Sequence, residues 1–209
     1  MRSFKIIYED KSIIVVDKPA GMLVIPTPKK ETHTLTVLLN RQLDARGIQV
    51  NAYPCHRLDR ETSGLIVYAK GKKVQKLMMD KFKEHKIKKY YLAFVHGRFN
   101  RGAGIIDQSI EHKGATTKYI VLEQRNNFSV VEIEPITGRT NQIRIHFKTI
   151  GHPLVGERKF AYAKDYKLKF RRTALHAAKI EFMHPLTNKS LSFSASLPLD
   201  MKVLLEAKT

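Results

Sequence analysis

The chain has 209 residues, 43% of them hydrophobic, which is enough to bury a core as one domain or as one domain with two lobes. Its 38 Lys and Arg residues outnumber 19 Asp and Glu residues, and the formal net charge is +19. This excess is larger than solubility requires and indicates a polyanionic partner, with nucleic acid first and an anionic membrane surface second. Thermophilic adaptation, the alternative, usually raises charges of both signs together.

The composition argues against export, membrane insertion and metal chemistry. No secretory signal opens the chain, and no apolar run approaches the ~18 residues that a membrane span needs. The one cysteine, Cys55, excludes an internal disulfide and fits a reducing cytoplasm, while zinc usually needs several Cys or His residues at short spacings. His56 follows Cys55, but sequence neighbours rarely form a catalytic dyad. Cys55 is therefore predicted to be a small packed residue.

The first half of the chain alternates β-rich runs with helical periodicity. Residues 6–8 and 13–16 predict a hairpin, and Pro19 and Gly21 then form a tight turn that presents Lys18. Hydrophobic spacing of three or four predicts helices, and β-rich runs predict strands. The spacing and the runs place helices at 34–46 and 70–85, and strands at 65–69 and 88–97.

The second half predicts more strands, joined mostly by hairpins. We expect strands at 105–110, 116–123, 129–136, 174–183 and 191–195, and helices at 143–150 and from Pro198 onward. Val203, Leu204 and Leu205 are expected to pack inward from the last helix. Nine or ten strands with four short helices indicate an α+β fold on a largely antiparallel sheet.

One stretch, YPCHRLDRETSGL at residues 53–65, sets a single carboxylate, that of Asp59, between the guanidinium groups of Arg57 and Arg60. Pro54 and Gly64 punctuate the stretch, so Asp59 should lie in a loop that leads into a strand. Neighbouring positive charge favours the ionised carboxylate, which can act as a nucleophile or a base. A surface salt bridge without function is the alternative interpretation.

Basic residues gather at two later places. Arg139 and Arg144 flank the first turn of the helix expected at 143–150, where backbone N–H groups also favour anions. Residues 164–172 carry five basic residues among aromatic and aliphatic ones, which suits a phosphate backbone. Simple exposure to solvent is the alternative for each of them.

Five motifs, in order, now resemble one family, the RluA-type RNA pseudouridine synthases. They are DKPAG at 17–21, HRLDRETSGL at 56–65, KYYLAFVHG at 89–97, TGRTNQIR at 137–144 and LHA at 175–177. One motif alone is a weak signal, whereas the ordered set is specific. The resemblance implies a pseudouridine-synthase-type α+β fold, with a largely antiparallel mixed sheet flanked by short helices. It implies a single catalytic domain at 1–209, and a division into two lobes, near 1–97 and 98–209, is left open. The chain is expected to depart from many members in lacking their small N-terminal RNA-binding domain.

The resemblance also implies a reaction: isomerisation of uridine to pseudouridine within RNA, without cofactor or metal. Asp59 would act at the ribose, by attack at C1′ or by proton removal at C2′, and the sequence leaves both open. Arg144 would pair with Asp59 in a bidentate geometry that Lys does not copy. Tyr91 would stack on the uracil and move a proton late in the reaction. A lone carboxylate fits this chemistry, whereas a hydrolytic glycosidase usually needs two.

Three further residues are expected at the RNA. By resemblance, Arg57 would help to displace the target base and fill the gap, with a second salt bridge to Asp59 as the alternative. Lys18 and Arg139 are candidates for phosphate contacts. Ribosomal RNA and transfer RNA are both open as partners, and the protein is expected to be a cytoplasmic monomer.

One residue departs from the family pattern. Asn141 stands where the family usually has His, between Thr140 and Gln142. Activity survives if this side chain only supports the turn, and falls if it orients the catalytic residues. The competing class is therefore an inactive RNA-binding or ribosome-assembly protein on the same fold.

Overall fold

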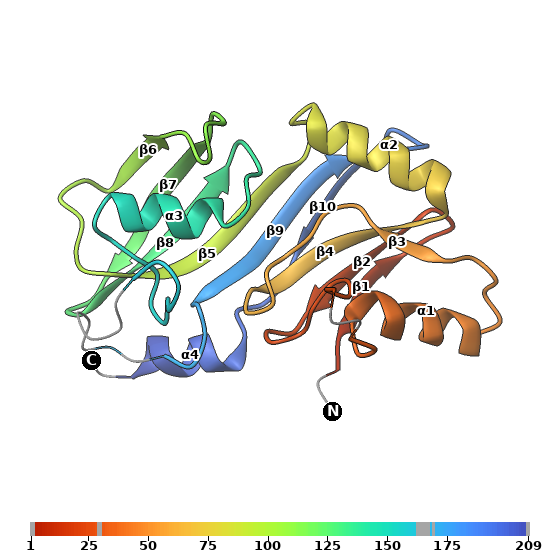
Figure 1. Ribbon diagram of the computed structural model, residues 1–209, viewed down its shortest axis with the longest axis horizontal. Coiled ribbons are helices and arrows are strands. Elements are labelled where there is room, and N and C mark those ends of the chain that lie inside the picture. Colours follow the sequence, from red (N-terminus) through yellow and green to blue (C-terminus); the bar gives the residue numbers. More distant parts are fainter. Residues whose placement is uncertain (1–2, 29–30, 162–167, 169, 208–209) are drawn as a thin grey trace. The chain divides into compact units, whose positions relative to one another are not determined.

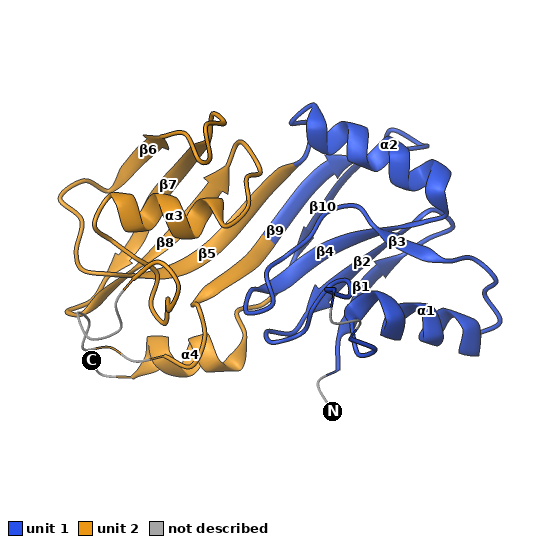
Figure 2. Cartoon of the chain, in the orientation of Figure 1, with its two compact units in different colours: residues 1–87, 179–195 blue, residues 88–178, 196–209 orange. Residues whose placement is uncertain are grey.

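The computed structural model describes residues 3–28, 31–161, 168 and 170–207 (Figure 1). The chain forms two compact units, shown in different colours in Figure 2. Unit 1 comprises residues 1–87 and 179–195, and unit 2 comprises residues 88–178 and 196–209. Along the chain, the first change of unit falls between residues 87 and 88, and residues 179–195 return to unit 1.

Unit 1 is built on antiparallel strands. These are β1 (Lys5–Glu9), β2 (Ile13–Lys18), β3 (Ala52–Pro54), β4 (Ser63–Lys70), the later residues of β9 (Leu175–Met183), and β10 (Ser190–Ser194). The β1–β2 hairpin is confirmed, and β2 pairs with β4 so that Lys18 lies opposite Gly64. This register brings the turn after β2 beside the loop before β4. The short strand β3, which pairs with β4, was not expected from the sequence.

Two helices of unit 1, both expected, cover apolar strands. Helix α1 (Leu35–Ala45) begins at Thr34, whose side chain accepts a hydrogen bond from the Val37 N–H, and ends before Gly47, which has a positive φ of 73°. Helix α2 (Lys72–Lys83) turns Met78 inward and leaves most of its lysines exposed. The buried core includes Ile13, Val15, Cys55, Leu65, Val67, Met78, Ile180 and Phe182.

Unit 2 carries an antiparallel meander. Its strands β5 (Lys88–His96), β6 (Ala103–Asp107), β7 (Thr116–Gln124) and β8 (Phe128–Pro135) lie in the order β5-β8-β7-β6, next to the first residues of β9. Each of the three pairs in this order is antiparallel. Tyr91, Ala93 and Val95, on one face of β5, are buried, and so is Phe94 on the other face.

Helix α3 (Gln142–Thr149) follows β8 and packs near it, and helix α4 (Leu199–Glu206) closes the described chain. The expected inward face of α4 is partly wrong. Met201 is fully buried and Leu204 and Leu205 pack on the core, but Val203 is 58% exposed. The core of this unit gathers Phe94, Phe128, Val130, Val155, Ala174 and Met201.

The expected fold class is confirmed. The described residues form ten strands, paired mostly antiparallel, and four helices. Among these residues, no helix is both long enough and apolar enough to cross a bilayer.

Candidate active site

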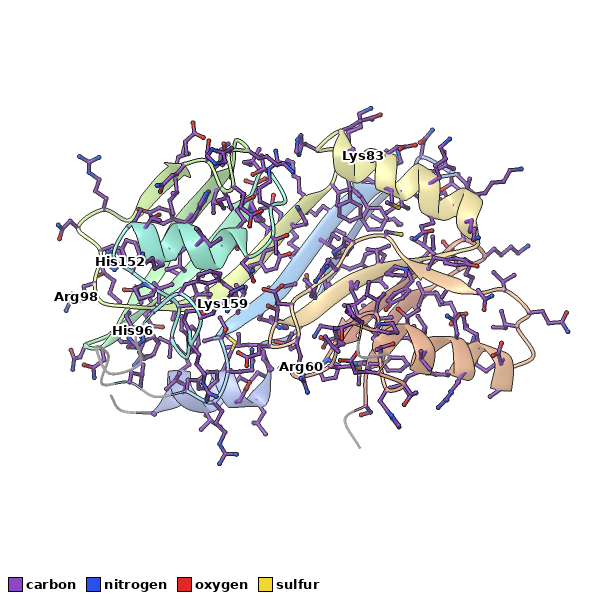
Figure 3. All side chains as sticks on the ribbon, viewed as in Figure 1. Arg60, Lys83, His96, Arg98, His152 and Lys159 are labelled. Atoms are coloured by element: carbon purple, nitrogen blue, oxygen red, sulfur yellow. The ribbon has the colours of Figure 1, made fainter. Side chains whose placement is uncertain are left out.

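Asp59 lies on the loop between β3 and β4 of unit 1 and is partly buried. The loop is tied to itself where the Thr62 N–H donates to the Asp59 carbonyl at 3.1 Å. It is also tied to the turn after β2, because the Gly21 N–H donates to the Arg60 carbonyl at 2.7 Å and Arg60 Nε donates back to the Gly21 carbonyl at 3.3 Å (Arg60 is labelled in Figure 3). Gly21 meets this loop with φ of 82°, which favours glycine. The turn therefore supports the loop that carries Asp59.

Lys18 does not have the phosphate-accessible position expected for it. Its side chain is fully buried, and its ammonium donates to the carbonyls of Pro19 at 3.1 Å, Met22 at 2.9 Å and Arg60 at 3.3 Å. An ammonium has three N–H donors, so these carbonyls use its donor capacity. Lys18 is thus an internal brace between the two loops, and its expected contact with phosphate is corrected.

The two guanidinium groups beside Asp59 in sequence do not pair with it. Arg60 donates to Gly21, while Arg57 is exposed and makes no hydrogen bond or ion pair with any residue that the structure describes. The alternative role for Arg57, a second salt bridge to Asp59, is therefore wrong. Within unit 1, the loop that carries Asp59 is held by the hydrogen bond from the Thr62 N–H and by the bonds between Arg60 and Gly21.

Tyr91 and Arg144 belong to unit 2. Tyr91 lies on β5, opposite Ile133 of β8, and its side chain is buried. Arg144 lies on the first turn of α3 and is 15% exposed. The approach of these two residues to Asp59 stays a prediction.

The start of α3 is held by a buried glutamine. Gln142 Oε1 accepts from the Thr137 hydroxyl at 2.7 Å and from the Arg139 N–H at 2.9 Å. Its Nε2 donates to the Thr116 carbonyl and the Thr117 hydroxyl, each at 3.0 Å. One side chain therefore joins the loop before α3 to β7 and fixes the backbone from which Arg144 projects.

Asn141 contacts Arg144 directly. Asn141 has φ of 55° and ψ of 22°, the left-handed region that Asn, Asp and His enter more readily than other non-glycine residues. Its Oδ1 accepts from Arg144 Nη1 at 2.8 Å. Asn141, the residue that departs from the family pattern, thus has a backbone conformation that His can also adopt, and its side chain orients Arg144.

Glu157 is a site residue that the sequence analysis missed. Its carboxylate receives Arg144 Nε on Oε2 and Arg144 Nη2 on Oε1, both at 2.7 Å, and its side chain is 1% exposed. The backbone N–H groups of Arg158, Lys159 and Phe160 also donate to Oε1. One signal was available, because Glu157 is the sole acidic residue between Glu134 and Asp165. A lone carboxylate in so basic a stretch is a natural partner for an arginine.

Burial of Glu157 by itself disfavours the anion. The hydrogen bonds from Arg144 and from the backbone outweigh this cost and lower the pKa of the carboxyl group below its usual value. Glu157 is therefore ionised at neutral pH and holds a full negative charge against Arg144. A guanidinium has five N–H donors, and Arg144 uses three of them on Glu157 and Asn141.

The remaining basic candidates divide into two kinds. Arg139 is exposed, with Nε donating to the Gly114 carbonyl at 3.0 Å. Most of the basic stretch 164–172 lies outside the described residues, which omit 162–167 and 169. Arg172, at its end, is buried and pairs with Asp200, with Nε 2.6 Å from Oδ2 and Nη2 2.9 Å from Oδ1. The expected phosphate role is thus wrong for Arg172.

Cys55 is packed, as expected. It is a buried free thiol in the core of unit 1, and burial raises its pKa to about 12, which opposes formation of a thiolate nucleophile. No group of three or more His, Cys, Asp or Glu among the described residues is arranged to hold a metal ion.

Comparison with known proteins agrees with the fold and the motifs. The family described as RNA pseudouridylate synthase matches residues 12–149, which include Asp59, Tyr91 and Arg144. The uncharacterized RNA pseudouridine synthase YlyB of Bacillus subtilis is 37% identical over 96% of this chain and 71% of its own length. Ribosomal large subunit pseudouridine synthase D of Zymomonas mobilis is 35% identical over the same shares. The dual-specificity RNA pseudouridine synthase RluA of Haemophilus influenzae is 32% identical over 91% of each chain.

Solved structures show the same fold. Human RNA pseudouridylate synthase domain containing 4 superposes with a TM-score of 0.78 at 22% identity, covering 93% of this chain and 88% of its own. Human RNA pseudouridylate synthase domain containing 1 gives 0.75 at 25% identity, covering 93% and 83%. Fold and motifs together define an isomerase that acts on RNA. The chain belongs to the RluA-type family of RNA pseudouridine synthases.

Proposed function

We propose that this enzyme isomerises specific uridines in structured ribosomal or transfer RNA, and that Asp59 acts at the ribose without a cofactor. The observation that carries the proposal is the family match over residues 12–149, which spans the three expected catalytic residues in their expected motifs. The name of one relative, a ribosomal large subunit enzyme, supports ribosomal RNA, and another relative is named as a dual-specificity enzyme. The net charge of +19 suits either polyanion.

The reaction needs one carboxylate and a well-placed cation. The glycosidic C–N bond breaks, the uracil turns, and a C–C bond forms, so no water is consumed. Asp59 attacks C1′ or removes the proton from C2′, and Arg144 keeps the carboxylate ionised and oriented. The clamp on Arg144 by Glu157 and Asn141 supports this role, because a guanidinium fixed on one side presents its other N–H groups in a set direction.

The target base must leave its stack before Asp59 can reach the ribose. Arg57 supports such a step, because its exposed side chain makes no hydrogen bond or ion pair within the described structure and can enter the gap. Tyr91 offers a ring for stacking and a hydroxyl for late proton movement. Arg139, exposed on the loop before α3, contacts phosphate.

We further infer a monomer working in the cytoplasm, which suits the single reduced cysteine. Single-stranded loops are the favoured targets, because their bases can be splayed out. The bond between Asn141 and Arg144 supports an active enzyme over the inactive RNA-binding alternative.

The test combines turnover with mapping. Tritium release from RNA labelled at uridine C5 should be seen with the wild-type protein and be lost in Asp59→Asn. Asp44→Asn, the same change at an exposed residue of α1, serves as the control and should turn over normally. RNA affinity should stay nearly intact in Asp59→Asn, because phosphate contacts supply most of it. Turnover by Asp59→Asn would remove Asp59 from its role.

Mapping identifies the target. Pseudouridines in total RNA from cells with and without this protein should differ at one or a few positions in ribosomal or transfer RNA. A difference confined to other RNA classes would overturn the proposed substrate.

A further inference from the structure

Lys89 occupies an unusual position near the start of β5. Side chains alternate along a strand, so Lys89 shares a face with Tyr91, two residues later, while Lys88 points to the opposite face. Lys88 is exposed, whereas Lys89 is partly buried. The Lys89 ammonium also adjoins the loop before α3, because Nζ lies 3.9 Å from the place where a Cβ on Gly138 would stand. Gly138 has no side chain to cover the ammonium.

The charge on Lys89 has no compensation among the residues that the structure describes. It makes no hydrogen bond or ion pair with any residue that the structure describes. Burial alone lowers its pKa, and no neighbouring carboxylate acts in the opposite sense. Lysines removed from water normally have a partner, since an uncompensated charge is costly. Lys89 therefore weakens the isolated protein, and an anion that arrives from outside would offset this cost.

We propose that Lys89 binds a backbone phosphate of the RNA beside the nucleotide that stacks on Tyr91. This inference rests on the proposed function and extends it, because it names a binding residue of the same site. A phosphate fits better than a base carbonyl, since its full negative charge compensates a desolvated ammonium. Arg139, next to Gly138, adds an exposed cation on the loop that Lys89 adjoins.

The alternative is that Lys89 serves only to cover apolar surface with its methylene groups while its head reaches water. The two roles differ in what removal of the charge does. If Lys89 binds phosphate, removal of its charge lowers the affinity for RNA but not the stability of the fold. If Lys89 only packs, replacement by a residue with a similar stem changes neither the RNA affinity nor the stability.

The experiment measures binding of unmodified transfer RNA and large-subunit ribosomal RNA transcripts at several salt concentrations. Lys89→Gln is compared with Lys88→Gln, which removes the same charge one residue away on the exposed face of the strand. All proteins carry Asp59→Asn, so that the RNA stays unmodified. A melting curve of each variant reports its stability.

We expect Lys89→Gln to weaken binding roughly tenfold at low salt and to reduce the slope of log affinity against log salt by about 0.7. Lys88→Gln should change affinity less than about twofold, within the usual effect of a single exposed charge. Lys89→Gln should melt at the same temperature as its parent or higher. Lys89→Arg should restore the salt slope, because it restores the charge.

Two results would overturn the inference: equal salt slopes for the Lys88 and Lys89 variants, or a lower melting temperature for Lys89→Gln with unchanged RNA affinity. Both are read from binding and melting alone. Failure here is therefore distinguishable from failure of the proposed reaction, which is read from tritium release.

Discussion

The carboxylate of Glu157 and the guanidinium of Arg144 meet through two parallel hydrogen bonds of 2.7 Å, Nε to Oε2 and Nη2 to Oε1. This fork geometry fixes the plane of the guanidinium, and the Asn141 side chain fixes it at a third point. Both members of the ion pair are largely buried. The direction in which Arg144 presents its remaining donors is therefore set by two residues that need not touch the RNA.

Glu157→Gln should reduce both stability and turnover. The amide keeps the shape but loses the charge, and leaves Arg144 buried without its counterion, which costs about 3 kcal/mol of unfolding free energy. For the enzyme measured well below its melting temperature, kcat should fall on the order of 10- to 100-fold with little change in RNA affinity. Glu157→Asp, which keeps the charge, should recover part of the loss. Urea unfolding and single-turnover kinetics provide the two readouts.

The pair between Arg172 and Asp200 offers a matched control, since it has the same two-point geometry in the same unit. Asp200→Asn should lower stability without changing kcat. Equal loss of kcat in both variants would mean that Glu157 acts only through general stability, and would contradict a positioning role.

Asn141→His, which creates the residue usual in the family, should preserve the fold and keep turnover within a few-fold. Both side chains tolerate the left-handed backbone at this position, where φ is 55°. Asn141→Gly separates backbone from side chain, because it keeps the conformation but removes the bond to Arg144. Loss of one such bond to a charged group is worth about 1.5 kcal/mol, so kcat should fall roughly tenfold. Unchanged turnover in the Gly variant would show that the backbone turn is all that matters here.

Lys18→Met should destabilise unit 1 and impair catalysis through Asp59. It removes the donor shared by the carbonyls of Pro19, Met22 and Arg60. Loss of the buried bond to the Met22 carbonyl costs roughly 2 kcal/mol, whereas the Arg60 carbonyl keeps its bond from the Gly21 N–H. The loop that carries Asp59 then loses one of its ties to the turn after β2. We expect lower kcat, measured by tritium release, and an unchanged salt slope of RNA binding. A reduced salt slope would restore Lys18 as a phosphate contact, and Lys5→Met, at an exposed residue of β1, is the control.

Periodicity and turn residues predicted most of the fold. The helix at 34–46 and the hairpin at 6–16 were predicted because local signals decide them: hydrophobic residues spaced three or four apart and β-branched runs. The short β3 carries too few residues for a pattern and depends on its pairing with β4. Val203 was misplaced because Leu204 and Leu205 follow it without a gap, and a run of three apolar residues does not reveal which side of a helix faces the core.

The candidate site was predicted less completely, for a physical reason. Motifs reveal residue types, but the partner of a charge depends on tertiary packing between distant segments. Arg57 and Arg60 are neighbours of Asp59 in sequence and do not pair with it, while Glu157 lies thirteen residues from Arg144 and does pair with that arginine. The sequence predicts an exposed turn lysine at Lys18. In the structure Lys18 is buried, and it ends β2 opposite Gly64 of β4, a pairing that the sequence does not reveal.

A last prediction concerns acid stability and His96, which is labelled in Figure 3 at the end of β5. Burial lowers the pKa of His96 from its ordinary 6.5 to about 4. Between these values the unfolded chain binds a proton that the folded protein does not, so stability falls as the pH drops through this window. The loss from this residue should be on the order of 1 kcal/mol between pH 7 and pH 5, after allowance for partial solvation.

Urea unfolding at pH 7, 6 and 5 measures this loss. His96→Gln should flatten the dependence, whereas His33→Gln, at an exposed residue before α1, should leave it unchanged. Glu157 acts at lower pH: its folded pKa lies below the usual 4.5, so the stability it confers is complete above that value and is lost as the pH falls through the lowered one. The two residues are thus separable by pH. If His96→Gln showed the same dependence of unfolding free energy on pH as the wild type, the loss of stability above pH 5 would belong to another group.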